Sequence, residues 1–271
     1  MEVKSEPHQN ALDASNAFNT FNTFTICIFI VCHDDASEEE AHKLSQTMYA
    51  GFSKIVRVSS SSKYFENQIF QYFASNRNEW DSFDYVGVCP YSWLKKTSVQ
   101  INNIKQTIEL DNGQTDVFSM LTLKFIKRKF NLEMSFIEAI THQHGPFMLH
   151  SMMAMLTSYG GYSPKQILSK KVQGFFMNHW IAKKSWMEKY VNFYITSKVL
   201  AESPALKEFM DEQSWYTGNL LTKPETLIRI SGKPHYTIHP FLFERLPAIF
   251  FHVEGANVKN VGSIGTYIFN D

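Results

Sequence analysis

The stretch TICIFIVCHDD, residues 25–35, indicates the fold more directly than any other part of the chain. Its apolar and β-branched residues run without interruption into polar ones, which is typical of a parallel strand that is buried on both faces and ends in a loop. A second stretch of this kind, FDYVGVCPY, covers residues 83–91 and stops at Pro90. We expect both stretches to be central strands of one sheet.

The segments between these strands follow the alternation of an α/β domain. Helices are expected over residues 37–52, where Ser37 and Glu40 have the spacing of a capping box, and over residues 64–76. A short strand, KIVRVSS, separates them at residues 54–60. This order predicts parallel strands joined by right-handed crossovers, with ligands bound at the carboxyl ends of the strands.

Beyond residue 100 the periodicity predicts mainly helices, followed by a last strand at residues 226–230. The predicted helices cover residues 102–112, 116–131, 136–159 with a break at Gly145 and Pro146, 185–201 and 204–220. No repeat or linker divides the chain. We therefore expect a polar, disordered leader at residues 1–22 and a single α/β domain at residues 23–271.

Composition excludes several classes of partner and location. Lys and Arg together number 26, as do Asp and Glu, so no basic field favours nucleic acid. The three cysteines, Cys27, Cys32 and Cys89, are too few for a disulfide framework and favour a reducing compartment. The longest apolar run, residues 25–32, is far shorter than the roughly 20 residues of a membrane span. We expect a soluble, cytoplasmic protein without a membrane span, located in the host cytoplasm if the chain is viral.

Common catalytic motifs are absent from the sequence. It contains no Gly-x-Gly-x-x-Gly, no phosphate-binding loop ending in Gly-Lys-Ser/Thr and no Gly-x-Ser-x-Gly, which weakens dehydrogenase, P-loop and serine hydrolase readings. His142, His144 and His150 lie close together, but no Cys pair or His-Glu-x-x-His supports a zinc site.

Three blocks in a fixed order point to a family. They are YFENQIFQYFASNRNEWDSFDYVGVCPYSW at residues 64–93, FFMNHWIAKKSWMEKYVNFY at residues 175–194 and HPFLFERLPAIFF at residues 239–251. Together they resemble bacterial capsular and exopolysaccharide glycosyltransferase domains, which are related to virus-encoded glycan-building enzymes. The resemblance implies a GT-A-like, Rossmann-type mixed sheet flanked by helices.

The match can be followed residue by residue. Glu66 corresponds to the acid of the family's helix, and Tyr91 to its loop tyrosine. The family's strand corresponds to Tyr85, Val86 and Gly87, and its middle segment to Asn178, Ile181, Lys183 and Lys184. Its last helix corresponds to Phe241, Leu242, Glu244, Arg245 and Leu246. Pro90 stands where the family has His, and Ser92 and Trp93 stand where it has two Arg, so the diphosphate is expected to be held differently. His179 and Trp180 replace Met and Phe, which implies a different sugar.

These matches and the chemistry of glycosyl transfer suggest roles for individual residues. Glu244 is the candidate general base, although a structural pair between Glu244 and Arg245 is an equal alternative. The candidate donor-binding residues are His33, Asp34, Tyr64, Glu66, Pro90, Tyr91, Ser92 and Arg245, of which Tyr64 or Tyr91 would stack on uracil. The candidate sugar- and acceptor-binding residues are His144, Asn178, His179 and Trp180. Core packing of Trp180, solvation of His33 and Asp34 in a loop, and a structural role of Glu66 remain open.

The expected activity is sugar transfer from a UDP-sugar to an oligosaccharide or glycoprotein glycan. UDP-xylose is one candidate donor, because His179 and Trp180 would fill the space of a C6 hydroxymethyl group. The chain has no Asp-any-Asp, so we expect no metal cofactor, with Lys95, Lys96 or Arg245 serving the phosphates; Mn or Mg at an atypical site is the alternative. A nucleotide-sugar hydrolase or phosphorylase, or a non-catalytic carbohydrate- or nucleotide-binding module on the same fold, also fits.

Overall fold

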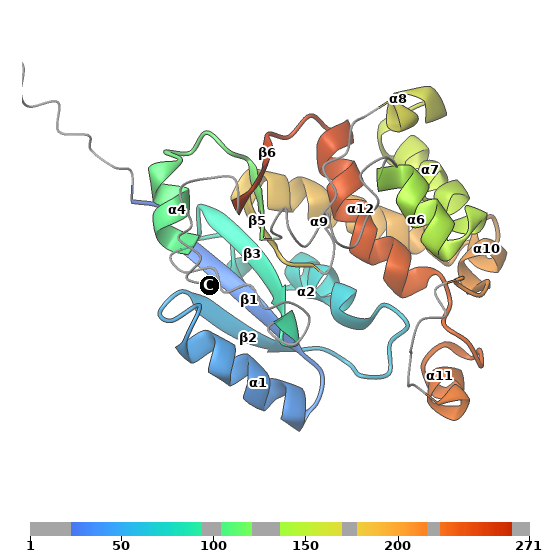
Figure 1. Ribbon diagram of the computed structural model, residues 1–271, viewed down its shortest axis with the longest axis horizontal. Coiled ribbons are helices and arrows are strands. Elements are labelled where there is room, and N and C mark those ends of the chain that lie inside the picture. The colour runs from blue at the N-terminus through green and yellow to red at the C-terminus, as the bar shows by residue number, and fades with distance from the viewer. Residues whose placement is uncertain (1–22, 94–103, 121–135, 170–177, 216–222, 262–271) are drawn as a thin grey trace, which may run out of the picture.

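The chain folds around a mixed β-sheet. The computed structural model describes residues 23–93, 104–120, 136–169, 178–215 and 223–261 (Figure 1). Within them the sheet has six strands in the order β2-β1-β3-β5-β4-β6. Their bounds are β1 Ile26–Cys32, β2 Ser53–Arg57, β3 Tyr85–Pro90, β4 Val117–Ser119, β5 Trp180–Lys183 and β6 Val258–Asn260. Strand β5 is antiparallel to both neighbours, whereas β1 pairs in parallel with β2 and β3, and β4 with β6.

The two central strands predicted from the sequence are confirmed. Every residue of β1 and β3 is buried, as expected for strands covered on both faces. Gly87 lies between Ile28 on β1 and Ile181 on β5, and a Cβ at Gly87 would come within 2.5 Å of Ile28 Cδ1 and 2.7 Å of Ile181 Cγ1. The glycine therefore allows the large side chains of both neighbouring strands to meet across β3.

Helices cover the sheet and form a second layer at one end of it (Figure 1). Helix α1 (Asp35–Gln46) packs on β1 and β2, while α9 (Lys184–Ala201) packs on β3, β5 and α2 (Ile69–Ser75). The remaining helices are η1 Phe65–Gln68, η2 Arg77–Glu79, α4 Ile104–Leu110, α6 Phe136–His144, α7 Pro146–Gly160, α8 Pro164–Leu168, α10 Lys207–Asp211, α11 Pro224–Ser231 and α12 His239–Val253. Helix α12 contacts α7, α8, α9 and η1, so it joins the helical layer to the segment that precedes α2.

The structure corrects several local predictions. Asp34, rather than Ser37, is the N-cap of α1, and Ser37 completes its capping box from the third helical position. The segment predicted as a helix from residue 116 begins with strand β4 instead, and residues 121–135 lie outside the described part of the chain. Residues 226–230, predicted as a strand, belong to α11, which begins at Pro224 and ends at left-handed Gly232.

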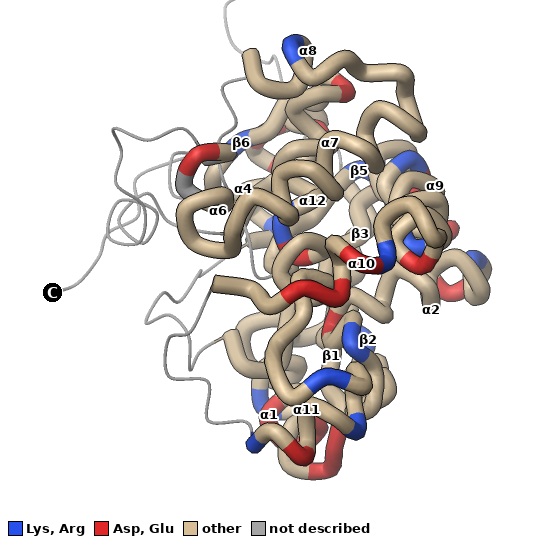
Figure 2. Tube along the Cα trace, turned by 90° about the vertical axis from the view of Figure 1, so that its right-hand side faces the viewer, with Lys and Arg blue, Asp and Glu red and all other residues tan. Residues whose placement is uncertain are grey.

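The charge distribution and the helix lengths bear on the classes of partner considered from the sequence. Basic and acidic positions are interspersed over the described helices (Figure 2), in line with equal numbers of each in the chain. No helix among the described residues combines the length and the hydropathy that a membrane crossing requires. The leader predicted at residues 1–22 lies outside the described residues.

Candidate functional site

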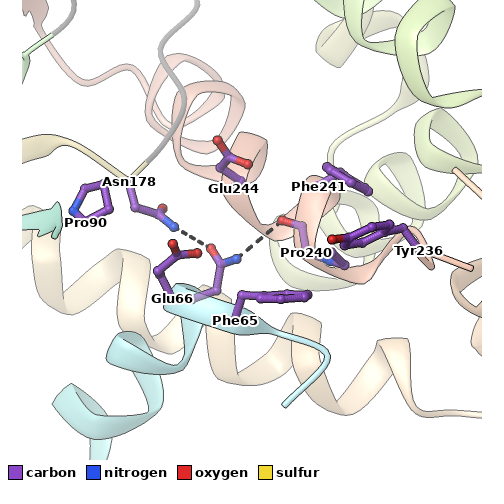
Figure 3. Close-up of a pocket in the computed structure, with 9 residues that line it drawn as sticks. Phe65, Glu66, Pro90, Asn178, Tyr236, Pro240, Phe241 and Glu244 are labelled. Carbon is purple, nitrogen blue, oxygen red and sulfur yellow. Dashed lines mark hydrogen bonds between the residues drawn. The ribbon is translucent and has the colours of Figure 1, made fainter. Parts of the chain in front are cut away.

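A cavity of about 130 Å³ lies where β3 ends, as expected for a ligand site at the carboxyl end of a parallel strand. Three segments distant in sequence enclose it together with the end of β3: η1, Asn178 two residues before β5, and the residues from Tyr236 into the second turn of α12 (Figure 3). The described lining residues are Phe65, Glu66, Asn67, Pro90, Asn178, Tyr236, Pro240, Phe241 and Glu244. Four of the site residues expected from the sequence, Glu66, Pro90, Asn178 and Glu244, are therefore brought together.

A hydrogen-bonded pair of asparagines ties the segments of the cavity to one another. The Asn67 amide nitrogen donates to the carbonyl oxygens of Tyr64 at 3.0 Å and Pro240 at 3.4 Å. Asn178 Nδ2 donates in turn to Asn67 Oδ1 at 2.8 Å. Since Asn67 is buried and bridges η1, α12 and the start of β5, it holds the walls of the cavity in place (Figure 3).

Asn178 has an unusual environment for a buried amide. It is 4% exposed, and its Oδ1 has no hydrogen-bond partner among the described residues. Leaving a buried acceptor unpaired costs about 1–3 kcal/mol, so this oxygen calls for an explanation, of which a bound ligand is one. Asn178 lines the cavity, and its unpaired Oδ1 is almost completely buried in the cavity wall.

Backbone strain is concentrated at the same cavity. Phe65 has φ 47° and Asn178 has φ 44°, and the third non-glycine residue with a positive φ among those described is Asn112, in a turn. Positive φ is costly for a bulky residue such as phenylalanine. Strain of this kind clusters at binding and active sites, where the surrounding structure maintains it.

Aromatic rings form the apolar side of the cavity. Phe65 stacks on Tyr236 at 6.3 Å between ring centroids, and Tyr236 contacts Phe241 at 5.9 Å. These rings and Pro240 offer flat apolar surface opposite the polar groups, an arrangement that suits a sugar ring. Phe65, Asn67, Tyr236, Pro240 and Phe241 line the cavity but were not predicted as site residues. All but Tyr236 stand in the matching blocks, and that position is the signal that could have found them.

Glu244 lies in the second turn of α12 and is paired with its neighbour. Arg245 NH1 lies 3.3 Å from Glu244 Oε2 and also donates to the carbonyl oxygen of Phe241 at 3.1 Å. Arg245 is buried outside the cavity lining, so its proposed contact with the donor is not supported by its position. The structural pair and the catalytic role of Glu244 are compatible, because the Glu244 carboxylate still lines the cavity.

His144 supports the aromatic wall from behind. Its ring stacks on Phe241 at 4.7 Å, and its Nδ1 lies 2.9 Å from Ser214 Oγ. Burial, with a smaller effect of the Arg245 charge, lowers the pKa of His144 to about 2. His144 is therefore neutral and positions Phe241; it is not among the residues that line the cavity.

His179 and Trp180 do not face the cavity. Trp180 is fully buried and packs between Phe70, at 5.7 Å, and Phe251, at 5.2 Å. His179 Nε2 lies 2.5 Å from Tyr49 OH, and its ring contacts Trp93 at 3.7 Å. The prediction that these side chains present an imidazole and an indole to a sugar does not fit their burial, and the argument for xylose that rested on them falls with it.

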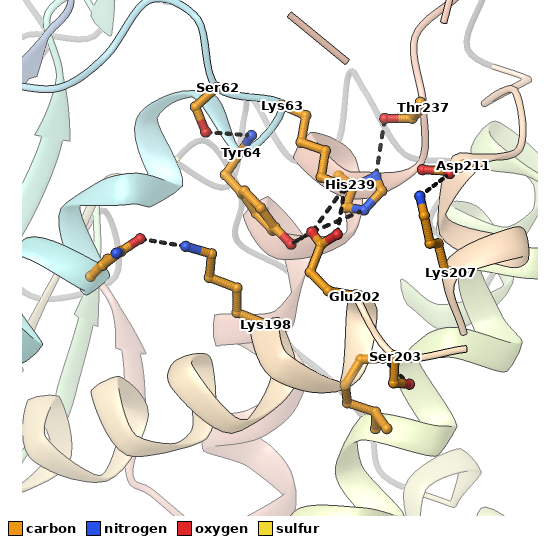
Figure 4. A network of polar contacts seen from close by, with 12 residues as sticks. Ser62, Lys63, Tyr64, Lys198, Glu202, Ser203, Lys207, Asp211, Thr237 and His239 are labelled. Atoms are coloured by element: carbon orange, nitrogen blue, oxygen red, sulfur yellow. Dashed lines mark hydrogen bonds and ion pairs between the residues drawn. The ribbon is translucent and has the colours of Figure 1, made fainter. Parts of the chain in front are cut away.

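Tyr64 also has a structural environment. Its hydroxyl donates to Glu202, which pairs with Lys63 Nζ at 2.9 Å in a polar network (Figure 4). Burial and the Glu202 carboxylate raise the pKa of Tyr64. Because its ring packs against His239 and Phe243, Tyr64 is not placed to stack on uracil as predicted.

The remaining predicted donor residues lie at the ends of β1 and β3. The rings of His33 and Tyr91 meet edge to face at 5.1 Å, both partly exposed. Asp34 caps α1, and its hydrogen bonds from Ser37 lower its pKa, which gives it a structural role. Ser92 is buried. Of the four predicted donor residues His33, Asp34, Tyr91 and Ser92, His33 and Tyr91 are the two that offer accessible ring surface.

Among the described residues, no group of three or more His, Cys, Asp or Glu side chains is arranged to hold a metal ion. Lys95 and Lys96, the predicted phosphate ligands, lie outside the described residues.

Comparisons of the chain with protein-family models, with curated proteins and with solved structures found no match.

Proposed function

We propose that the chain is a glycosyltransferase that moves a sugar from a nucleotide sugar to a glycan, with the cavity at the end of β3 as its sugar site. The mixed α/β sheet with one antiparallel strand is compatible with the GT-A-like fold that the sequence resemblance implies. The observation that carries the proposal is the buried Asn178 Oδ1, which has no partner among the described residues and shares a cavity with two carboxylates and a wall of aromatic rings. Polar acceptors opposite flat rings match the two faces of a pyranose.

In the proposed reaction Glu244 is the general base. Its carboxylate removes the proton from an acceptor hydroxyl as that oxygen attacks the anomeric carbon of the donor. The bond from this carbon to the diphosphate oxygen breaks, and the nucleoside diphosphate leaves with the bonding electron pair. Asn178 and Glu66 orient the sugar by accepting hydrogen bonds from its hydroxyl groups, and burial of the reacting atoms limits hydrolysis.

The donor nucleotide, the metal requirement and the location extend the proposal. A uridine diphosphate remains the expected leaving group, and a cytoplasmic location the expected one. Transfer without a divalent ion predicts that activity persists in a strong chelator. Loss of activity that manganese restores would instead identify an atypical metal site.

The test is a screen of UDP- and GDP-sugars for acceptor-dependent product with purified protein. Glu244→Gln should lower kcat by about 100-fold or more while leaving the unfolding transition in place, because general base catalysis contributes roughly that much. Glu225→Gln, which alters an exposed carboxylate on α11, is the matched control. Wild-type turnover in Glu244→Gln would remove the catalytic role of this residue.

A non-catalytic sugar-binding module is the second candidate, and the size of the cavity favours it. About 130 Å³ is small beside the roughly 300–1,000 Å³ of typical ligand pockets, so the described cavity suits a single ring better than a whole nucleotide sugar. Stabilisation of the protein by sugars but by no nucleoside diphosphate would favour this module over the transferase.

A further inference from the structure

The hydrogen bonds of Asn67 determine how the side-chain amide of Asn178 is oriented. Asn67 contacts two backbone carbonyl oxygens, of Tyr64 and Pro240, and carbonyls only accept hydrogen bonds. The amide nitrogen of Asn67 must therefore face them, so its Oδ1 faces Asn178. This oxygen requires a donor, which fixes Asn178 Nδ2 at 2.8 Å from it. The atom of Asn178 that is left without a partner is consequently its Oδ1, an acceptor, and this assignment follows from the hydrogen-bond network.

The charged groups among the described lining residues have one sign. Of these nine residues, two are Glu and none is Lys, Arg or His. Figure 3 shows Glu66 and Glu244 approaching from η1 and α12, with Asn178 near both. Arg245, which follows Glu244 in α12, is buried and bound to Glu244 and to the Phe241 carbonyl oxygen. Among the described residues, a ligand in the cavity thus meets two glutamates and Asn178, whose unpaired atom is an acceptor.

These groups discriminate between classes of ligand. Hydroxyl hydrogens of a neutral sugar satisfy carboxylate and amide oxygens, and the rings of Phe65, Tyr236 and Phe241 cover its apolar face. An anionic group instead meets like charges and an acceptor that it cannot satisfy, and like-charge contacts suppress binding strongly. Phosphate groups and uronic acids are therefore poor ligands for this cavity.

We propose that the cavity binds a neutral, hydroxyl-rich sugar ring and rejects acidic sugars and phosphate. The inference rests on the proposed function for the role of this ring as a substrate, and it goes further by setting the substrate class. The diphosphate of a nucleotide sugar then binds against residues other than those lining this cavity. The acceptor groups Asn178 Oδ1, Glu66 and Glu244 carry the selection.

The experiment measures binding of matched ligand pairs to the full chain by calorimetry and ligand-observed NMR. The pairs are methyl glucoside with methyl glucuronide and methyl galactoside with methyl galacturonide, since each pair differs only in replacement of the C6 hydroxymethyl group by a carboxylate. We expect at least one neutral glycoside to bind at least about tenfold more tightly than its acidic partner. Inorganic pyrophosphate should not compete with it.

Three variants and one control connect the selection to the cavity. In Glu66→Gln and Glu244→Gln the preference for the neutral partner should shrink, whereas Glu225→Gln on the exposed face of α11 should keep it. Asn178→Ala should weaken binding of the neutral glycoside itself. Folding of each variant is checked by its urea unfolding midpoint.

Four results would overturn the inference. They are equal or tighter binding of the acidic partners, competition by pyrophosphate, binding of none of the four glycosides, and tight binding of Mn²⁺ alone that depends on Glu66 and Glu244. Failure of the proposed function has a different signature. Absence of transfer from every donor, together with intact discrimination by charge, would leave a neutral-sugar binding site without transferase activity.

Discussion

Acidification should destabilise the protein well above the pH at which carboxylates titrate, because three histidines are buried in the neutral form. His144, His179 and His239 are at most 1% exposed. Burial lowers the pKa of His144 to about 2 and, with the Lys63 charge, that of His239 to about 3; burial also holds the pKa of His179 well below its ordinary value. Their rings contact the neutral hydroxyl groups of Ser214, Tyr49 and Thr237, and His239 Nε2 also lies 3.8 Å from Glu202 Oε1.

The magnitude follows from proton linkage. In the unfolded chain each histidine takes up a proton as the pH falls through about 6.5, whereas in the folded chain it does not until far lower pH. The stability of the folded state is therefore complete above pH 6.5 and is lost as the pH falls below it. Between pH 7.0 and 5.5 each histidine costs about 1.3 kcal/mol, or about 4 kcal/mol for the three together. This is a large part of a typical total of about 5–15 kcal/mol.

Carboxylates do not contribute to the loss of stability between pH 7.0 and 5.5. Against the effect of burial, hydrogen bonds from lysines and Tyr64 lower the pKa values of Asp116, Glu202 and Asp211. Their contribution is present above the pKa of the unfolded groups, whose ordinary pKa values are 3.8 for Asp and 4.5 for Glu, and is lost only as the pH falls below these. The loss between pH 7.0 and 5.5 therefore reports the histidines.

The assay is urea unfolding followed by tryptophan fluorescence at pH 7.0, 6.0 and 5.5 and constant ionic strength. With a slope of about 3 kcal/mol per molar urea, the midpoint should fall by about 1 M over this range. His144→Gln and His239→Gln should each remove about a third of the pH dependence, while His42→Gln, on the exposed face of α1, should remove none. Equal midpoints at pH 7.0 and 5.5, or the same pH dependence in all variants, would refute the reasoning.

Three further substitutions test packing and the site. Gly87→Ala should cost about 1–3 kcal/mol of unfolding free energy, since its Cβ would come within 2.5 Å of a neighbouring side chain; an unchanged urea midpoint would contradict the close packing. Trp180→Ala should cost about 3–5 kcal/mol by the same measurement, as a core residue does, and a selective loss of sugar binding without destabilisation would argue instead for a ligand contact. Asn178→Gly should be about 1 kcal/mol more stable than Asn178→Ala, because glycine adopts the φ of 44° without strain. Calorimetry should show weakened sugar binding in both variants. Equal stability of the two variants would remove the strain argument.

The sequence predicts the first half of the sheet well because its signals are local. Long apolar runs gave β1 and β3, and the alternation of strand and helix gave their parallel arrangement with β2, all confirmed by the structure. Strands β4 and β5 have only three and four residues, too short for a periodicity to register. Their pairing joins segments far apart in the sequence, which local patterns do not contain.

Helix α11 shows how local signals can also conflict. The β-branched residues at 226–230 favour a strand, but Pro224 at the start and left-handed Gly232 at the end are typical of a helix. The helix prevails because its apolar stripe places Leu227 in the core while the polar residues face outward.

The site could be anticipated in its polar part only. Glu66, Asn178 and Glu244 stood out because they occur in blocks that resemble a family, and the structure brings them to one cavity. Phe65 and Tyr236 could not be singled out in a chain with 23 Phe and 12 Tyr, because nothing in the local sequence tells which rings face a cavity. Trp180 misled for the same reason, since an indole suits a sugar and a core equally well.

The antiparallel strand β5 affects how the chain can fold during synthesis and where it can be cut into two fragments. It is the strand that joins β1, β2 and β3 to β4 and β6, so the two parts of the sheet share hydrogen bonds only across it within the described residues. During synthesis, β3 has no partner on this side until residues 180–183 have left the ribosome, and its edge must be shielded until then. A fragment that stops before β5 would retain that bare edge and aggregate, so reconstitution from two pieces should succeed only if the cut lies after Lys183.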